Sequence, residues 1–165
     1  MPTKPYDREK SLAYTNKWAL SNNPDYYNFS SLGGDCTNFA SQVIYAGSGV
    51  MNYTPVYGWY YNNANDKSPA WSGVNYLYNF LVNNKETGPY AEETGVKEME
   101  VGDIIQLSFV GNNNFQHSLV VTKINHPINF ENINISTHSP HAYNEKLTNY
   151  SWAQIRFIHI KGVNV

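Results

Sequence analysis

The spacing of apolar residues changes midway along this chain of 165 residues, and this change constrains the fold more than any other feature. In the first half, apolar residues recur at the three- and four-residue steps of helices. In the second half they alternate along short runs rich in branched residues. Helices gathered first and strands gathered second predict an α+β fold, with N-terminal helices packed on a C-terminal antiparallel β-sheet. We expect one domain over residues 1–165, because no repeat, low-complexity segment or linker divides the chain.

Three helices are expected in the first half. Asp7 is a suitable N-cap for the first helix, which should end near residues 22–24. Four side chains are available for its buried face: Leu12, Ala13, Tyr14 and Trp18. The second helix should begin at Cys36 and end at the glycines of residues 47–49. The third should span residues 71–82, after a Ser-Pro pair.

Four strands are expected in the second half, separated by segments rich in Gly, Asn and Pro. They span residues 103–109, 117–124, 133–138 and 154–160. The turn residues between them are typical of antiparallel connections, which supports a single antiparallel sheet.

The only cysteine, Cys36, lies where a Gly-Gly loop leads into the second helix. A helix N-terminus lowers the pKa of a thiol, and a thiolate attacks carbonyl carbon, so this position suits a nucleophile. A single cysteine forms no internal disulfide, and the structural alternative is a buried small hydrophobic side chain or an unused thiol.

A cysteine nucleophile needs a base within hydrogen-bond reach and a third polar group that orients the base. Of the five histidines, His117 opens an expected strand and could face the N-terminus of the second helix. His138 ends the next strand, where it could bond to the far nitrogen of His117. Each histidine taken alone is also compatible with a structural or solvated role.

Charge and hydropathy exclude several classes of protein. The net charge is -2, with no basic patch for nucleic acid. No apolar run approaches the roughly 20 residues that a membrane span needs, so no integral membrane segment is expected. Residues 1–5 lack the apolar core of a signal peptide, and we expect a cytoplasmic protein unless a leader has been removed, in which case it would be extracellular or associated with the cell wall. The oligomeric state is left open.

Aromatic residues are abundant, with 14 tyrosines and 4 tryptophans. Their flat faces and polar tips are suited to a groove for a sugar or an extended peptide, and equally to the core of a small mixed domain. A cluster at Trp59, Tyr60 and Tyr61 falls in a segment expected to be a loop, where it could form the wall of such a groove.

Several segments of the chain, in their order along it, resemble those of the putative amidase domain family. This is a bacterial group of papain-like cysteine amidohydrolases, related more distantly to NlpC-type and CHAP-type cell-wall hydrolases. The most specific is Asp35-Cys36-Thr37-Asn38-Phe39-Ala40-Ser41-Gln42. The others are the opening helix of residues 6–18, Trp59 and Trp71, the Gly-Asp strand opening of residues 101–106, His117-Ser118, and Ser136-Thr137-His138. The resemblance covers nearly the whole chain.

This resemblance implies a papain-like fold and a cysteine-dependent amidase or peptidase that acts through an acyl-enzyme on cell-wall peptide or a related small peptide, with no cofactor or metal. Cys36 would be the nucleophile, His117 the base that later protonates the leaving amine, and His138 the residue that orients His117. The backbone N–H of Cys36 would help to bind the oxyanion, with Tyr26 or Tyr27 as candidates for a second donor.

Other residues of the signature are expected to support the site. Asp35 could cap the Cys36 helix, and Asn38 and Gln42 could satisfy buried backbone groups behind it or contact substrate. Trp59 is a candidate substrate contact, and Asp103 could close a turn before its strand.

Three alternatives stay open at the level of sequence. An acyltransferase or transpeptidase would use the same cysteine and histidine, with an amine in place of water. A noncatalytic module would bind glycan or peptide through its aromatic surface. A zinc site at Cys36, His117 and His138 is disfavoured, because structural zinc takes four protein ligands and no fourth accompanies these three.

Overall fold

The computed structural model describes residues 1–165 as a mixed α+β fold with four α-helices. The helices are α1 (Arg8–Trp18), α2 (Cys36–Ser48), α3 (Pro69–Ser72) and α4 (Val74–Asn83). The strands are β1 (Thr3–Lys4), β2 (Tyr61–Asn63), β3 (Asp66–Lys67), β4 (Gly88–Thr94), β5 (Ile104–Ser108), β6 (His117–Ile124), β7 (Ile133–Thr137), β8 (Ala142–Lys146) and β9 (Gln154–Asn164). Three short 3-10 turns cover Val96–Glu98, Phe130–Asn132 and Leu147–Asn149.

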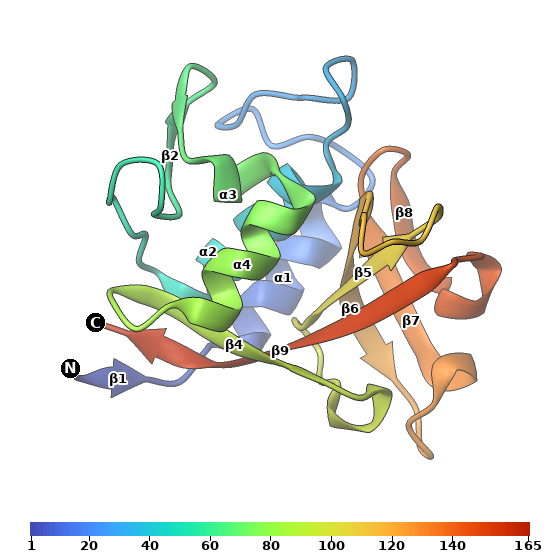
Figure 1. Cartoon of the computed structure of the whole chain (residues 1–165). Coiled ribbons are helices and arrows are strands. Elements are labelled where there is room, and N and C mark those ends of the chain that lie inside the picture. The colour runs from blue at the N-terminus through green and yellow to red at the C-terminus, as the bar shows by residue number, and fades with distance from the viewer.

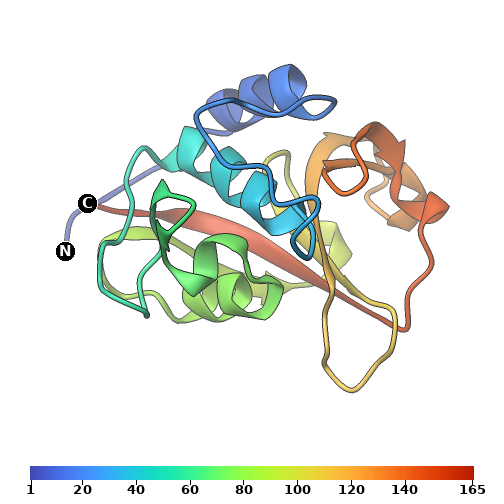
Figure 2. The same ribbon diagram turned by 90° about the horizontal axis from the view of Figure 1, so that it is seen from above.

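One antiparallel sheet of seven strands organises the molecule, in the order β1-β9-β5-β6-β7-β8, with β4 paired to β9. The long strand β9 joins its two parts, because its first half pairs with β5 and its second half with β4 and β1. Figure 1 shows the two chain termini side by side at the end of β9, and Figure 2 shows α2 lying along the sheet between α1 and the pair α3 and α4. The hairpin of β2 and β3 is separate.

The expected order of helices before strands is confirmed, with additions. β6 has the bounds predicted from sequence, and the other three expected strands are present with shifted ends. Five strands were not predicted. β1, β2 and β3 are only two or three residues long, and β2 includes Tyr61, which was expected in a loop. β4 begins Gly-Pro and carries two glutamates, and β8 is mostly polar. β4 and β8 each pair with one neighbour only, so they lie at edges of the sheet. The expected helix over residues 71–82 is divided at Gly73, whose backbone is extended.

Helix α1 begins as predicted, and its buried face agrees with the prediction only in part. The Asp7 carboxylate accepts a hydrogen bond from the Lys10 amide at 3.0 Å, which is an N-cap. Tyr14 and Trp18 pack against the core as expected, the fully buried residues are Ser11 and Thr15, and Ala13 is exposed. Both hydroxyls bond to carbonyls of their own helix, so they can be buried without leaving a donor unpaired. The helix ends at Trp18, earlier than predicted.

Helix α2 lies at the centre of the fold. It runs from Cys36 to Ser48 and ends in a left-handed Gly49 with φ 71°. Gly47 does not stop the helix: a Cβ there would lie 2.4 Å from the Tyr6 ring, so glycine permits a close contact with the segment before α1. Eleven of its residues are buried, which makes α2 the rigid element on which the site is built.

Alternation along the strands divides the core into two layers. Ile104, Val120 and Ile158 face the helices, whereas their neighbours Ile105, Leu119 and Phe157 belong to a second apolar cluster on the opposite face of the sheet. By the same alternation Ser118 faces the helices. His117 is paired in register with Leu107, a residue of the second cluster.

Candidate active site

The N-terminus of α2 places Cys36 against the beginning of β6. The residue is 8% exposed. Its Sγ lies 3.7 Å from the Thr37 hydroxyl oxygen, and the backbone N–H of Ser118 donates a hydrogen bond to the same sulfur. Burial raises the pKa of the Cys36 thiol, and these hydrogen bonds offset only part of the rise. The thiol pKa is therefore raised, whereas its position at a helix N-terminus predicted a lowered value, and the main cause is desolvation of the thiolate by burial.

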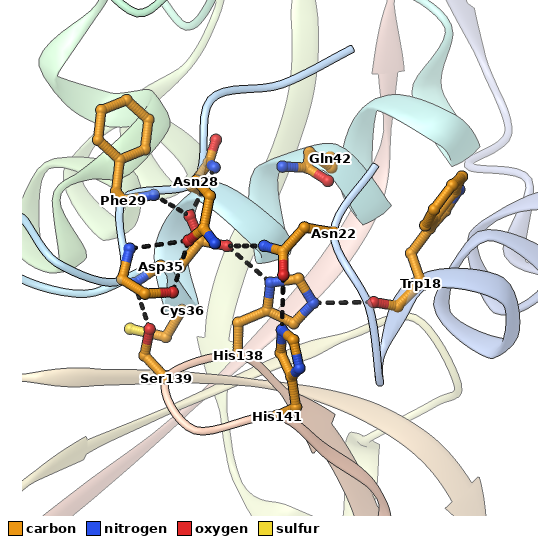
Figure 3. A network of polar contacts seen from close by, with 12 residues as sticks. Trp18, Asn22, Asn28, Phe29, Asp35, Cys36, Gln42, His138, Ser139 and His141 are labelled. Atoms are coloured by element: carbon orange, nitrogen blue, oxygen red, sulfur yellow. Dashed lines mark hydrogen bonds and ion pairs between the residues drawn. The ribbon is translucent and has the colours of Figure 1, made fainter. Parts of the chain in front are cut away.

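A buried pair of Asp35 and His138 lies beside Cys36 (Figure 3). His138 Nδ1 lies 2.6 Å from Asp35 Oδ2, and the two side chains are 1% and 0% exposed. His138 Nε2 lies 2.8 Å from the carbonyl oxygen of Trp18, at the end of α1. A carboxylate oxygen and a carbonyl oxygen therefore lie within hydrogen-bond reach of the two ring nitrogens, which fixes the orientation of the ring. The ring also stacks on Phe39 of α2, with centroids 4.0 Å apart.

The Asp35 carboxylate is held by further donors. Its Oδ1 accepts from the Phe29 amide at 2.9 Å and from the Asn38 side chain at 2.8 Å, and its Oδ2 accepts from Asn22 at 3.3 Å. Burial by itself would raise the pKa of Asp35. The hydrogen bonds from His138, Asn38 and Phe29 outweigh that effect and hold its pKa below the usual value.

Asp35 is not the side-chain cap that the sequence predicted. It stands at the N-cap position of α2, but its side chain accepts no hydrogen bond from the backbone amides of the first turn, and its one bond to that turn is to the Asn38 side chain. The carboxylate turns instead to His138, 103 residues away in the chain. The amides of the first helical turn, including that of Cys36, therefore receive no side-chain cap.

Two loops close over Cys36, and sequence reasoning did not identify the residues that join them. Ser139 Oγ accepts from the Asp35 amide at 2.7 Å. Asn22 bridges Asp35 and His141, whose Nε2 lies 2.9 Å from the Asn22 side-chain oxygen. Figure 3 shows this network joining the loop before α2 to the turn after β7. The position of Ser139 directly after His138 was the only signal in the sequence.

The predicted contact between His117 and His138 is not formed. Both ring nitrogens of His138 are occupied by Asp35 and Trp18, so neither is left for His117. The physical reason is the strand register, in which Val120 pairs with Ser136. If this register continues to the end of β7, His138 lies across from Ser118. His117, one residue earlier in β6, therefore points to the opposite face of the sheet.

His117 is buried and has no hydrogen-bonding partner for its ring. It is 7% exposed and lies between aromatic rings, with its centroid 5.9 Å from that of Tyr150 and 6.4 Å from that of Phe109. Burial lowers the pKa of His117 to about 4, so the ring is neutral at neutral pH. It follows directly after Gln116 and before Ser118, whose amide bonds to the Cys36 sulfur. The structure contains no hydrogen bond between Cys36 Sγ and either histidine.

Three predicted supporting residues take structural positions. Asn38 donates to the Tyr27 carbonyl at 2.9 Å, as expected of a residue that satisfies a buried backbone group. Gln42 pairs with the Tyr14 hydroxyl instead of with backbone. Trp59 is fully buried in the apolar core and its indole N–H donates to Ser41, so it does not form a groove wall in this structure. Its segment pairs back on Asn52, which turns the ring inward.

The other sequence candidates also have defined positions. The Tyr26 ring stacks on Trp71, with centroids 5.9 Å apart, and the Tyr27 side chain packs on Phe29. Neither tyrosine makes a hydrogen bond to Cys36. Asp103 closes the expected turn, since its Oδ2 accepts from the Glu100 amide at 2.8 Å.

A chain of polar side chains runs from Cys36 across the helix-facing side of the sheet. The Thr37 hydroxyl lies 2.9 Å from that of Ser118, and Gln106 Nε2 donates to Ser118 Oγ at 3.1 Å. The Gln106 carbonyl oxygen in turn accepts from Arg156. These contacts join the N-terminus of α2 to β6, β5 and β9 through buried side chains.

No group of three or more His, Cys, Asp or Glu side chains is arranged to hold a metal ion. None of the helices has the length and apolar character that crossing a bilayer requires.

Comparison with known proteins identifies relatives of this chain. A family model described as "Putative amidase domain" matches residues 5–160. The uncharacterized protein YhbB of Bacillus subtilis (strain 168) is 31% identical over 118 residues, which is 70% of this chain and 37% of that protein. The chain thus spans little more than a third of the length of this relative. No solved structure matches the chain significantly.

Proposed function

The chain belongs to the putative amidase domain family, and from that premise we propose that it is a papain-like cysteine hydrolase of amide bonds, with Cys36 as nucleophile and His117 as base. The family description suggests hydrolysis of an amide. The observation that carries the cysteine mechanism is the position of Cys36, the only thiol, at the uncapped N-terminus of α2 and in contact with the residue after His117. As substrate we propose cell-wall peptide or a related small peptide, which rests on the family resemblance.

His117 suits the role of base better than His138 does, and because β6 turns its side chain away from α2 in this structure, its ring must rotate toward Cys36 to take the proton. Its ring nitrogens have no partner within the protein, and burial lowers its pKa to about 4, so the ring is neutral at neutral pH and keeps a lone pair free to take the thiol proton. Both ring nitrogens of His138 are already occupied, one by Asp35 and the other by the Trp18 carbonyl oxygen. In this proposal His117 transfers protons and His138 positions the first turn of α2.

The reaction proceeds through general-base catalysis rather than a preformed ion pair. With the thiol pKa raised and the His117 pKa lowered, the resting pair is thiol and neutral imidazole. As Sγ attacks the carbonyl carbon, its proton passes to His117. That proton then goes to the leaving amine as the C–N bond breaks and a thioester remains. Water attacks the thioester with His117 again as base, which releases the acid and restores the thiol.

The developing oxyanion would be bound by the first turn of α2. Amides at a helix N-terminus point outward and carry a partial positive charge, and Asp35 leaves them uncapped. The Cys36 amide is the donor nearest to the attacking sulfur. Asp35 and His138 position this turn, because they join it to α1 and to the end of β7.

The test is hydrolysis of a panel of peptide amides, with release of amine measured for the wild type and for Cys36→Ala, His117→Ala and His126→Ala. We expect no turnover from Cys36→Ala and a loss of about 100-fold or more from His117→Ala. His126 is exposed and serves as the matched histidine control, with activity unchanged. Full turnover by Cys36→Ala would contradict the proposal, as would full turnover by His117→Ala.

The rate of Cys36 alkylation against pH separates a general base from an ion pair. We expect an apparent thiol pKa above the ordinary value of about 8.5, nearly the same in the wild type and in His117→Ala. A low apparent pKa that rises when His117 is removed would instead establish a thiolate–imidazolium pair and replace the general-base step. Added amines in the product assay distinguish hydrolysis from acyl transfer.

A further inference from the structure

A second site lies on the helix-facing side of the sheet, between α4, β4 and β9. It is a cavity of about 480 Å³, which is within the range of small-molecule pockets. The lining residues are mostly polar: Asn75, Tyr78, Asn79, Glu93, Asn113, Phe115, Gln154, Ile155 and Arg156. None of them belongs to the network around Cys36 and His138 that is shown in Figure 3. Figure 1 places α4 over the strand pair that forms the floor.

Arg156 is a buried cation whose one acidic neighbour, Glu93, acts on it without forming an ion pair. It is 9% exposed, and its guanidinium lies between two aromatic rings, 3.7 Å from the centroid of Tyr78 and 3.8 Å from that of Phe115. Its Nε and Nη2 donate to the Gln106 oxygen at 2.9 Å and 2.6 Å, and Nη2 also donates to Asn75 at 3.0 Å. Nη1 has no hydrogen-bond partner, and no carboxylate forms an ion pair with this side chain.

This arrangement favours a ligand, because a buried charge costs free energy unless an opposite charge contacts it, and Glu93 does not contact Arg156 as an ion pair. Neutral amides hold two of the three guanidinium nitrogens in a fixed plane, and the two rings prevent rotation out of that plane. A guanidinium fixed in this way presents its remaining N–H groups in the geometry that a carboxylate accepts. A purely structural arginine would use those donors within the fold.

The cavity also contains one acid, Glu93, on β4. Its carboxylate accepts from the Tyr78 hydroxyl and makes no ion pair, whereas its neighbour Glu92 pairs with Lys161 at 3.3 Å. Glu93 and Arg156 are not in contact with one another as an ion pair, so the cavity separates one negative from one positive group. A simple anion would be repelled by Glu93, and a simple cation by Arg156.

We propose that this cavity binds a free amino acid or short peptide in its zwitterionic form. The ligand carboxylate lies at Nη1 of Arg156, the α-ammonium group lies at Glu93, and the neutral side chains of Asn79, Asn113 and Gln154 hydrogen-bond the peptide group between them. The proposal concerns a site separate from Cys36, and it stands whether or not the chain hydrolyses amides.

Glycylglycine is the probe for the intact chain, with binding measured by calorimetry and by the side-chain NMR signal of Arg156. Two matched ligands each lack one charge: glycylglycine amide has no carboxylate, and N-acetylglycylglycine has no ammonium group. We expect saturable binding of glycylglycine, with a shift of the Arg156 signal, and binding at least tenfold weaker for either derivative. Equal affinity for the three ligands, or no binding of glycylglycine, would overturn the proposal.

Variants assign the two ends of the ligand. Glu93→Gln keeps an acceptor for Tyr78 and removes the charge, so glycylglycine should bind at least fivefold more weakly while N-acetylglycylglycine is unaffected. Glu92→Gln, the next residue on β4, is the control and should leave glycylglycine binding unchanged. Arg156→Lys retains the charge and loses the planar fork, and should weaken both ligands that carry a carboxylate. Unchanged glycylglycine binding in Glu93→Gln would refute the assigned orientation and with it the zwitterion site.

Discussion

Two aspartate–histidine pairs occur in this molecule, and only one of them lies beside a nucleophile. Asp35 and His138 are 2.6 Å apart next to Cys36, and Asp103 and His159 are 2.8 Å apart at the opposite end of β5. Both aspartates are fully buried. An Asp–His contact is therefore no evidence of catalysis by itself, because this fold uses the same chemistry twice.

The two pairs differ in how the aspartate charge is balanced. Asp103 also accepts from the Arg8 guanidinium at 2.8 Å and from the Ile160 amide at 2.9 Å, so it joins α1 to β5 and β9. Asp35 has no arginine or lysine partner, and its only ionisable partner is His138. The pair near Cys36 thus depends wholly on one histidine, whereas the other pair has an additional permanent cation.

Removing each aspartate gives the largest expected effect on stability. Asp35→Ala leaves the buried His138 ring without its partner, and Asp103→Ala leaves the partly exposed Arg8 and His159 without theirs, so we expect each to lower the free energy of unfolding by about 2–3 kcal/mol. Urea denaturation measures both, with Asp66→Ala on the exposed β2–β3 hairpin as control. A loss below about 1 kcal/mol from Asp35→Ala would show that the charge on Asp35 is not needed by His138.

Changes of pH should alter the free energy of unfolding with opposite signs at the two regions: the region of His117 and Asp35 loses stability in acid, and the region of His159 loses it in base. The pKa of His117 is lowered to about 4, so the unfolded chain binds a proton more readily, and this contribution to stability falls as pH drops from about 6.5 to 4, by up to about 3 kcal/mol. The lowered pKa of Asp35 adds a loss at still lower pH. The hydrogen bond from His159 to Asp103 raises the His159 pKa, so its contribution is present below pH 6.5 or so and is lost as pH rises through the raised value.

Unfolding free energies measured across pH test these signs. His117→Gln should flatten the decline between about pH 6.5 and 4, and His159→Gln should flatten the decline on the alkaline side. If His117→Gln leaves the acid limb as steep as in the wild type, the buried neutral imidazole is not its source.

Replacing each aspartate with asparagine tests which of the two pairs contributes to hydrolysis. Asp35→Asn weakens the hold on His138 and on the first turn of α2, and we expect it to reduce hydrolysis by about 10- to 100-fold. Asp103→Asn should change hydrolysis by less than about threefold once folding is confirmed by circular dichroism. Similar losses in kcat for both variants would mean that the two pairs act on the site alike.

The smallest expected effect concerns the loop that closes over the thiol. Ser139→Ala removes the single acceptor for the Asp35 amide, at a cost of about 1 kcal/mol. Cys36 should then react faster with iodoacetamide, because the two loops part more readily. Ser151→Ala, at an exposed position, is the control. A slower reaction in Ser139→Ala would contradict this role of the loop.

Local patterns predicted the parts of the fold that local forces determine. The Asp7 cap, the start of α2 at Cys36 and the bounds of β6 all follow from capping preference and from apolar spacing. The polar strands β4 and β8 escaped prediction, since their stability comes from pairing with neighbours and not from their own residues. Trp59 is a further example, because its position in a loop does not indicate whether its ring faces solvent or the core, and the ring is fully buried.

The amino-acid sequence defines which residue types are available for chemistry and where the chain changes from helices to strands. The partners that these residues meet are set by how the helices and strands pack together. His117 and His138 lie near each other on paired strands, but strand register turns them toward different faces, and Asp35 reaches His138 across 103 residues. Such contacts depend on register, on twist and on which buried charge needs neutralising, and these are properties of the assembled sheet and helices, not of any local segment.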